Sequence, residues 1–375
     1  MTMIKRVVDI SKNLKKGKVL IMYGPRQVGK TTLIQEYLSK TPFKYKYSIG
    51  DDLQLARDLS KCTITSTINY VGNYDLLVID EAQKIPNIGL ALKLMVDTFP
   101  EKYFIATGSS SFDLASQTAE SLTGRKNVID LYPISQFELS KDISRDELIH
   151  QIESFLIYGS YPDVLNQTTY LEKEKVIKQL TNSYLLKDIL EYCGIKNSNK
   201  IVSILKLLAF QVGSEVSTVE IANSVAIDSK TVANYLDLFE KSFVIFSLGG
   251  FSRNLRKEVT KMSKYYFYDT GIRNALISNF NKLEDRNDIG QLWENFLMIE
   301  RRKINSYTNF NTNYYFWRTY DQKEIDLIEE NSGELNGFEF KWQEKQLKPP
   351  KLWLETYNNA SFKEINKENY LDFIT

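Results

Sequence analysis

The sequence predicts an α/β protein with a mostly parallel sheet in its amino-terminal third and a second α/β region near its carboxyl end. Two observations lead to this fold class. Short apolar runs alternate with helical patterns through residues 1–135, as in strand–helix–strand units. After about Gln291, a helical pattern precedes alternating strand patterns that are interrupted by the turn-like segment NSGELNG.

Five apolar runs are the predicted strands of the first region. They lie at Val19–Tyr23, Tyr45–Ile49, Leu76–Ile79, Tyr103–Thr107 and Val128–Tyr132. Pro133 follows the last run, and because proline lacks the N–H of a ladder hydrogen bond, it marks the exit from the sheet. Residues 136–215 then carry apolar residues at helical spacing.

The composition argues against several classes of function. His150 is the only histidine and Cys62 and Cys193 lie far apart, so neither a zinc site nor Ser-His or Cys-His catalysis is expected. The formal net charge is +1, so nucleic acid would have to bind a local basic patch. No apolar run approaches the roughly 20 residues that span a membrane, and no signal-peptide pattern is present. We therefore expect a soluble, cytoplasmic protein with no membrane partner.

A glycine-rich turn joins the first predicted strand to a helical pattern. Residues 24–31 read GPRQVGKT and match G-x-x-x-x-G-K-[ST], the P-loop of nucleotide hydrolases. Its glycines let backbone N–H groups approach phosphate oxygens, its lysine reaches the β- and γ-phosphates, and its threonine hydroxyl is a magnesium ligand. A chance glycine turn is the alternative, and the flanking strand and helix patterns disfavour it. The pattern predicts ATP and Mg²⁺, bound by Gly24, Pro25, Arg26, Gln27, Val28, Gly29, Lys30, Thr31 and Thr32, with Thr31 on the metal.

Two adjacent acids end the apolar run in LLVIDEAQ, residues 76–83. Asp80 stands where a carboxylate would hold the magnesium shell, and Glu81 where a base would polarise the attacking water. Alternatively, both are solvated residues at a helix start. The P-loop 50 residues earlier favours the catalytic interpretation.

Ser109 and Arg125 are further candidates for the ATP site. If the strand in YFIATGSSS lies between the P-loop strand and the acid-bearing strand, Ser109 is able to contact the γ-phosphate or the water; otherwise it caps the next helix. Arg125, in the loop before the last strand, would stabilise transition-state charge in cis or from a neighbouring subunit, or else is a surface arginine.

These segments resemble the AAA+ ATPases, and more closely a bacterial and archaeal group with an AAA domain, a winged helix and a C-terminal domain of unknown function. The resemblance rests on GPRQVGKTT, LLVIDEAQ, ATGSSS, SLTGR…LYPISQFE, YGSYP, FYDTGIRNAL and YYFWRTYDQKEIDLI, which cover nearly the whole chain. It implies a five-stranded sheet with the sensor strand in the centre, and Arg125 as an arginine finger or equivalent sensor.

Residues 217–247 have the spacing of a helix-turn-helix, with a capping box at Ser217 and Glu220. The second helix would present Lys230 near its start, where groove-reading residues lie. A basic stretch follows and is predicted to grip DNA phosphates as a wing; the alternative is a protein-packing module with a solvated basic hairpin. The predicted DNA contacts are Lys230, Arg253, Arg256, Lys257, Lys261 and Lys264.

The carboxyl-terminal region places acids on one helical and two strand patterns. Glu339 and Lys341 share one face of a strand, and the hairpin turn would bring Asp326 beside them. With Glu294 on the helix, this pattern resembles the PD-(D/E)XK nuclease fold, although Ile325 stands where proline often precedes the aspartate. Such a group can hold Mg²⁺ and orient a water; the alternative is a binding scaffold whose acids and lysine form a surface ion pair.

Four domains are predicted: an ATPase domain at 1–135, a lid-like helical region at 136–215, a winged-helix-like domain at 216–267 and a nuclease-like domain at 268–375. Three functions remain open: a DNA-associated ATPase that contacts double-stranded DNA, a nucleotide-dependent switch that binds a protein partner, and an ATP-regulated nuclease. An oligomer is compatible with each of them.

Overall fold

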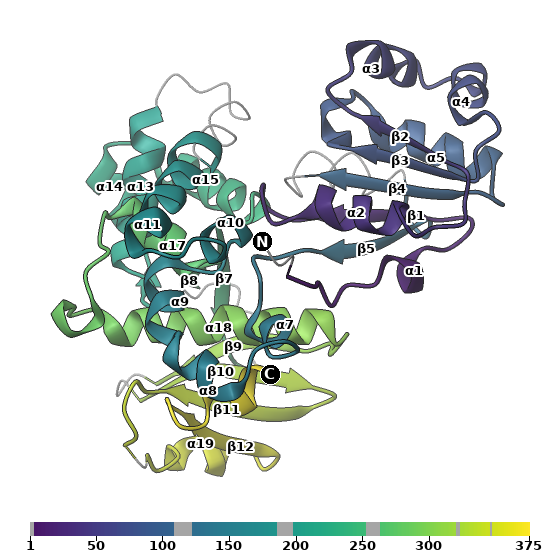
Figure 1. Cartoon of the computed structure of the whole chain (residues 1–375). Helices are drawn as coiled ribbons and strands as arrows, with labels where there is room; N and C mark the ends of the chain where they lie inside the picture. The colour runs from purple at the N-terminus through teal and green to yellow at the C-terminus, as the bar shows by residue number, and fades with distance from the viewer. Residues whose placement is uncertain (1–3, 109–121, 186–197, 253–262, 320–322, 346) are drawn as a thin grey trace. The chain divides into compact units, whose positions relative to one another are not determined.

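The computed structural model describes residues 4–108, 122–185, 198–252, 263–319, 323–345 and 347–375 (Figure 1). The chain divides into two compact units, one formed by Lys5–Tyr132 with Lys241–Phe243 and the other by most of the rest. In the described ranges, no helix is long and apolar enough to cross a membrane.

The first unit is built on a five-stranded parallel sheet, as the sequence predicts. The strands are β1 (Val19–Tyr23), β2 (Tyr45–Ile49), β3 (Leu76–Asp80), β4 (Tyr103–Gly108) and β5 (Lys126–Asp130). They are ordered β2-β3-β4-β1-β5, so β4 lies in the centre, between the P-loop strand β1 and the acid-bearing strand β3. Every residue of β1 and β3 is buried, which explains their continuous apolar runs.

One helix precedes these parallel strands and others connect them. They are α1 (Ile10–Asn13), α2 (Lys30–Leu38), α3 (Leu53–Ser60), α4 (Ile64–Val71), η1 (Ala82–Lys84) and α5 (Ile88–Thr98). Figure 1 shows α2 directly after β1, and α3 and α4 together beyond the edge strand β2. Because the carboxyl ends of parallel strands share one edge of the sheet, the residues that follow β1, β3 and β4 meet there.

The second unit begins with helices. They are α7 (Gln136–Leu139), α8 (Arg145–His150), α9 (Ile152–Tyr158), α10 (Pro162–Leu165), α11 (Tyr170–Gln179), η2 (Leu180–Leu185), α13 (Ser198–Phe210), α14 (Thr218–Val225) and α15 (Ser229–Lys241). Later helices are α17 (Thr270–Leu276), η3 (Leu283–Asp285), α18 (Ile289–Tyr307), α19 (Lys351–Thr356) and α20 (Tyr370–Ile374).

A seven-stranded sheet runs through this unit. Its strands are β6 (Glu215–Val216), β7 (Ile245–Gly250), β8 (Ser263–Phe267), β9 (Asn313–Arg318), β10 (Glu324–Asn331), β11 (Glu334–Phe340) and β12 (Ala360–Ile365), in the order β12-β11-β10-β9-β7-β8-β6. The antiparallel set β6, β7 and β8 joins the remaining strands through a parallel pairing of β7 with β9. One sheet therefore crosses the predicted domain boundary at 267/268.

Two segments without a predicted chemical role, YGSYP and FYDTGIRNAL, pack against each other in the interior of the second unit. Asp269 caps α17 through Ile272 N (3.1 Å) and also accepts from Ser160 N (2.8 Å). Gly159 has φ +76°, and a Cβ there would lie 2.0 Å from Asp269 Oδ1. The tight approach of the two segments therefore requires glycine at position 159.

Candidate nucleotide site and a second carboxylate cluster

The P-loop connects the buried strand β1 to α2, where the sequence predicts it. Gly29 is the N-cap of α2, with φ +94°. Gly24 has φ +152°, and a Cβ there would stand 2.1 Å from Leu131 O, so only glycine fits beside the end of β5. This geometry leaves the helix amino terminus facing the space where an anion binds.

Lys30 is buried at the start of α2. Its Nζ donates to Gly24 O (2.7 Å) and Pro25 O (2.9 Å), so the ammonium lies directly over the loop. The predicted phosphate ligand therefore has its positive charge where a nucleotide's phosphates would enter.

Asp80 and Thr31 are brought into contact from β3 and α2. The Thr31 hydroxyl donates to Asp80 Oδ2 at 2.7 Å, and the carboxylate is 4% exposed. A hydroxyl and a carboxylate are the oxygen ligands that Mg²⁺ takes together with nucleotide phosphates, so this pair fits the ion that the P-loop implies.

Two further residues, which the sequence analysis did not assign, hold the same carboxylate. The Tyr47 hydroxyl on β2 donates to Asp80 Oδ2 at 2.7 Å, and the Thr107 hydroxyl on β4 donates to Asp80 Oδ1. Burial, with the hydrogen bond to Asp80, raises the pKa of the Tyr47 hydroxyl far above its usual range, so it remains a donor. Their only sequence signal is a polar residue in a strand that neighbours the acid-bearing strand.

Glu81 follows β3 in a left-handed conformation, φ +52°. Its backbone N–H donates to Asp80 Oδ1 (3.1 Å) and to Thr107 Oγ1 (3.0 Å), which fixes the turn. Its Oε2 accepts from Gln83 Nε2 at 2.6 Å. The half-buried carboxylate thus stands beside Asp80 and has a neutral partner, as suits a group that accepts a proton from water.

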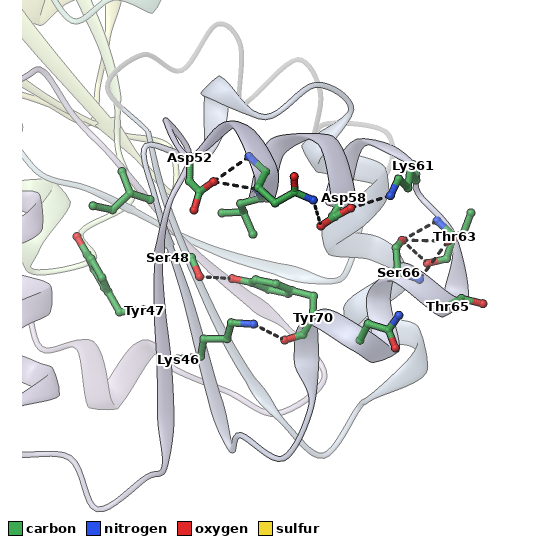
Figure 2. A pocket seen from close by; sticks show the side chains of 14 residues that line it. Lys46, Tyr47, Ser48, Asp52, Asp58, Lys61, Thr63, Thr65, Ser66 and Tyr70 are labelled. Carbon is green, nitrogen blue, oxygen red and sulfur yellow. Dashed lines mark hydrogen bonds and ion pairs between the residues drawn. The ribbon is translucent and has the colours of Figure 1, made fainter.

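Tyr47 also lines a cavity of about 730 Å³ along β2, α3 and α4 (Figure 2). Lys46 and Ser48 face the helices and contact Tyr70 of α4. Lys46 Nζ donates to Tyr70 O (3.0 Å), and the Tyr70 hydroxyl donates to Ser48 Oγ (3.0 Å). Tyr47 points to the other side of the strand. Tyr47 therefore connects the wall of this cavity to the carboxylate of Asp80.

Ser109 lies outside the described residues, although β4 does occupy the central position on which its prediction depended. Arg125 lies at the opposite edge of the sheet from the P-loop. Its carbonyl accepts from Val19 N (2.8 Å) at the start of β1, whereas Gly24 follows the end of that strand. A five-residue strand spans about 16 Å, so Arg125 does not reach the P-loop of its own chain and a role in cis is not supported. Its Nε pairs with Asp97 Oδ1 at 2.6 Å.

The predicted DNA contacts differ in their surroundings. Lys230 is exposed near the start of α15, as expected. Arg253, Arg256, Lys257 and Lys261 lie outside the described residues. Lys264 is 2% exposed and pairs with Glu324, so its assignment as a DNA contact is wrong. Strand β8 turns its side chain inward, away from any phosphate backbone.

Glu294, Asp326, Glu339 and Lys341 do come together around Lys264. Residue pairing of β10 with β11 sets Asp326 beside Glu339, and Lys341 Nζ donates to Glu339 Oε1 at 2.6 Å. Burial and the negative charge of Asp326 raise the pKa of Glu294 to about 8 and that of Glu339 to about 7. The predicted grouping is therefore present as a buried, strongly interacting cluster.

This cluster does not fit a bound magnesium ion, because the ammonium of Lys264 already pairs with Glu324 and lies 3.7 Å from Glu294 Oε1. Glu294 Oε1 accepts from Tyr266 OH (2.6 Å), and Asp326 Oδ2 accepts from Phe340 N (2.8 Å). Across the described ranges, no group of three or more His, Cys, Asp or Glu side chains is arranged to hold a metal ion. We therefore derive no metal-dependent step here.

Three family models match successive parts of the chain. Residues 16–140 match a model described as AAA domain. Residues 149–283 and 289–367 match two domains of unknown function, DUF8612 and DUF4143.

Similar whole proteins are uncharacterised. One from Mycobacterium tuberculosis is 26% identical, with 88% of this chain and 71% of the relative covered. One from Methanocaldococcus jannaschii is 26% identical, with 98% and 89% covered. One from Haemophilus influenzae is 25% identical, with 84% and 80% covered.

Solved structures with some likeness include a RuvB mutant of Thermotoga maritima and Drosophila ORC bound to AT-rich DNA and Cdc6. The first is 14% identical with a TM-score of 0.28 and covers 61% of this chain and 81% of that chain. The second is 10% identical with a TM-score of 0.25 and covers 70% and 86%. At these TM-scores neither supports a statement about this chain. The match to the AAA domain model, residues 16–140, covers the part of the chain that carries the P-loop and the five-stranded parallel sheet.

Proposed function

We propose that this chain binds ATP with Mg²⁺ and hydrolyses it at the carboxyl edge of the five-stranded sheet. The observation that carries the proposal is the 2.7 Å contact between Thr31 and Asp80, beside a P-loop whose Lys30 lies over the phosphate site. The chain thus assembles an anion-binding turn, a cation and a pair of metal ligands from separate elements.

Each side chain has a distinct part in the proposed reaction. Backbone N–H groups of the loop and Lys30 would bind the phosphates, and Thr31 and Asp80 would hold Mg²⁺, which supplies charge neutralisation at the β- and γ-oxygens. Glu81 would take a proton from the water that attacks the γ-phosphate. Thr107 and Tyr47 hold Asp80 in position through their hydroxyls.

Phosphate release by purified protein in MgATP tests this proposal. We expect turnover in wild type, lost ATP binding in Lys30→Ala, and retained binding with slow turnover in Glu81→Gln. Normal turnover in Glu81→Gln would remove Glu81 from the mechanism.

A second proposal is that the second unit contacts double-stranded DNA as a winged helix. Its support is the helix pair α14 and α15, followed by β7 and β8, with β6 completing a small antiparallel sheet. Lys230 is exposed at the expected place, and Asp228 accepts from Thr231 N (2.8 Å) to cap α15. We also propose that the chain forms an oligomer and acts in the cytoplasm.

Salt-dependent binding to a DNA duplex tests the second proposal. Lys230→Ala should weaken binding and lower its salt dependence, whereas Lys206→Ala, on α13, is the matched control. No affinity for DNA at low salt would favour the alternative, a nucleotide-dependent switch that binds a protein partner.

A further inference from the structure

The carboxylate cluster of the second unit already contains a cation supplied by the chain. Lys264 Nζ pairs with Glu324, lies 3.7 Å from Glu294 Oε1, and stands 5.2 Å from the centre of the Phe316 ring. These groups come from β8, β10, α18 and β9, so four elements converge on one ammonium.

Lys264 is fixed in this position by the sheet. Its strand β8 is central in the small antiparallel set, where Lys264 pairs with Glu215 of β6 and Leu248 of β7. The side chain is 2% exposed, and a buried ammonium is tolerated only with anionic partners. The two strand pairings therefore hold the backbone of Lys264, and its anionic partners hold the buried ammonium.

We propose that Lys264 is the resident cation of this cluster and stands where a divalent metal ion would otherwise bind. Lys264 and Tyr266 both contact Glu294 at Oε1, so that oxygen already has a cation and a hydrogen-bond donor in place of a metal ion. The second unit then engages its partners without metal-dependent cleavage of a phosphodiester. This inference is independent of ATP hydrolysis in the first unit.

The remaining acids do not restore a metal site. Glu339 Oε2 is buried and has no hydrogen-bond partner in the described part of the chain, but Lys341 holds the other oxygen of the same carboxylate. A divalent ion at Asp326 and Glu339 would stand between two ammonium groups, Lys264 and Lys341. Repulsion between like charges at such distances is strong in a buried site.

Mn²⁺ binding to the nucleotide-free full-length chain, measured by electron paramagnetic resonance, tests the proposal. Lys264→Met keeps the length of the apolar stem and removes the charge. We expect Asp326→Asn to leave Mn²⁺ binding of the wild type unchanged. Lys264→Met should gain one bound ion per chain relative to wild type, and adding Asp326→Asn should remove it.

Three outcomes of this experiment decide whether Lys264 or a metal ion occupies the cluster. Loss of a wild-type Mn²⁺ ion on Asp326→Asn would overturn the proposal, because it would show a metal site beside Lys264. A folded Lys264→Met protein that gains no Mn²⁺ would also overturn it. If Lys264→Met does not fold, as judged by circular dichroism, the comparison of wild type with Asp326→Asn still decides whether the cluster holds a metal.

Discussion

Asp80 in the first unit is a buried carboxylate and Glu294 in the second is a half-buried one, and their partners differ in charge. Asp80 accepts hydrogen bonds from the hydroxyls of Thr31, Tyr47 and Thr107, which are neutral. Glu294 accepts from Tyr266 and faces the ammonium of Lys264. Neutral donors orient a carboxylate and leave its charge for an incoming cation, whereas an ammonium compensates that charge. The two clusters are therefore suited to different chemistry: one to receive a metal ion, the other to remain closed to it.

Lys30→Ala gives the largest expected effect on ATP binding at the first site. The variant loses the ammonium that lies over the P-loop. A hydrogen bond to a charged group contributes about 1.5–3 kcal/mol, so ATP affinity should fall by at least about 10- to 100-fold. Titration with a fluorescent ATP analogue measures it. Lys40→Ala is the control, since Lys40 is exposed in the turn after α2 and pairs with Glu36 of that helix. Equal affinities in both variants would contradict the assigned role.

Arg125→Ala tests whether the first site is complete within one chain or needs an arginine from a neighbouring subunit. Because Arg125 lies at the opposite edge of the sheet, we expect normal ATP binding and a turnover reduced by about 10³-fold, as for arginine fingers supplied in trans. The wild-type rate per subunit should rise with protein concentration.

A mixture of variants separates trans action from a local defect. Arg125→Ala lacks the arginine and Glu81→Gln lacks the base, so mixed assemblies contain some complete sites. Activity above that of either variant alone supports action in trans. A wild-type rate independent of concentration, with no gain on mixing, would leave Arg125 as a surface arginine paired with Asp97.

Glu81→Gln should reduce turnover by about 10²–10⁴-fold, the usual contribution of a general base, while ATP affinity is kept. The amide preserves the shape of the side chain but has no basic oxygen pair. Single-turnover phosphate release measures the chemical step. Glu36→Gln, on α2, controls for the loss of one negative charge near the site.

Features built from residues that are close together in the sequence could be predicted from the sequence. Strand β1, the P-loop and α2 follow each other in the chain, so one motif of eight residues places Lys30 and Thr31 correctly. The β10–β11 hairpin is also local, and its turn places Asp326 beside Glu339 as expected. In both places the spacing along the chain determines the spacing in the fold.

Tyr47, Thr107 and Lys264 depend on contacts between distant elements. Tyr47 and Asp80 are 33 residues apart in the sequence, and the residue pattern of the strand that contains Tyr47 does not predict this contact. Lys264 follows a basic stretch, and this proximity suggested a DNA contact. Its alternation with Tyr266 in β8 was the informative signal, since both side chains are buried on the same strand.

Tyr47→Phe gives the smallest expected effect and tests the idea that neutral donors merely orient Asp80. Removing one hydroxyl costs about 1 kcal/mol, so the Mg²⁺ concentration for half-maximal ATP hydrolysis should rise about fivefold, with ATP affinity in excess Mg²⁺ unchanged. Tyr45→Phe is the matched control, because Tyr45 is 41% exposed on the same strand. A Mg²⁺ requirement that is unchanged in Tyr47→Phe would mean that Thr31 and Thr107 alone orient the carboxylate. A requirement that falls would mean that the Tyr47 hydroxyl competes with the metal ion, as we infer for Lys264 in the second unit.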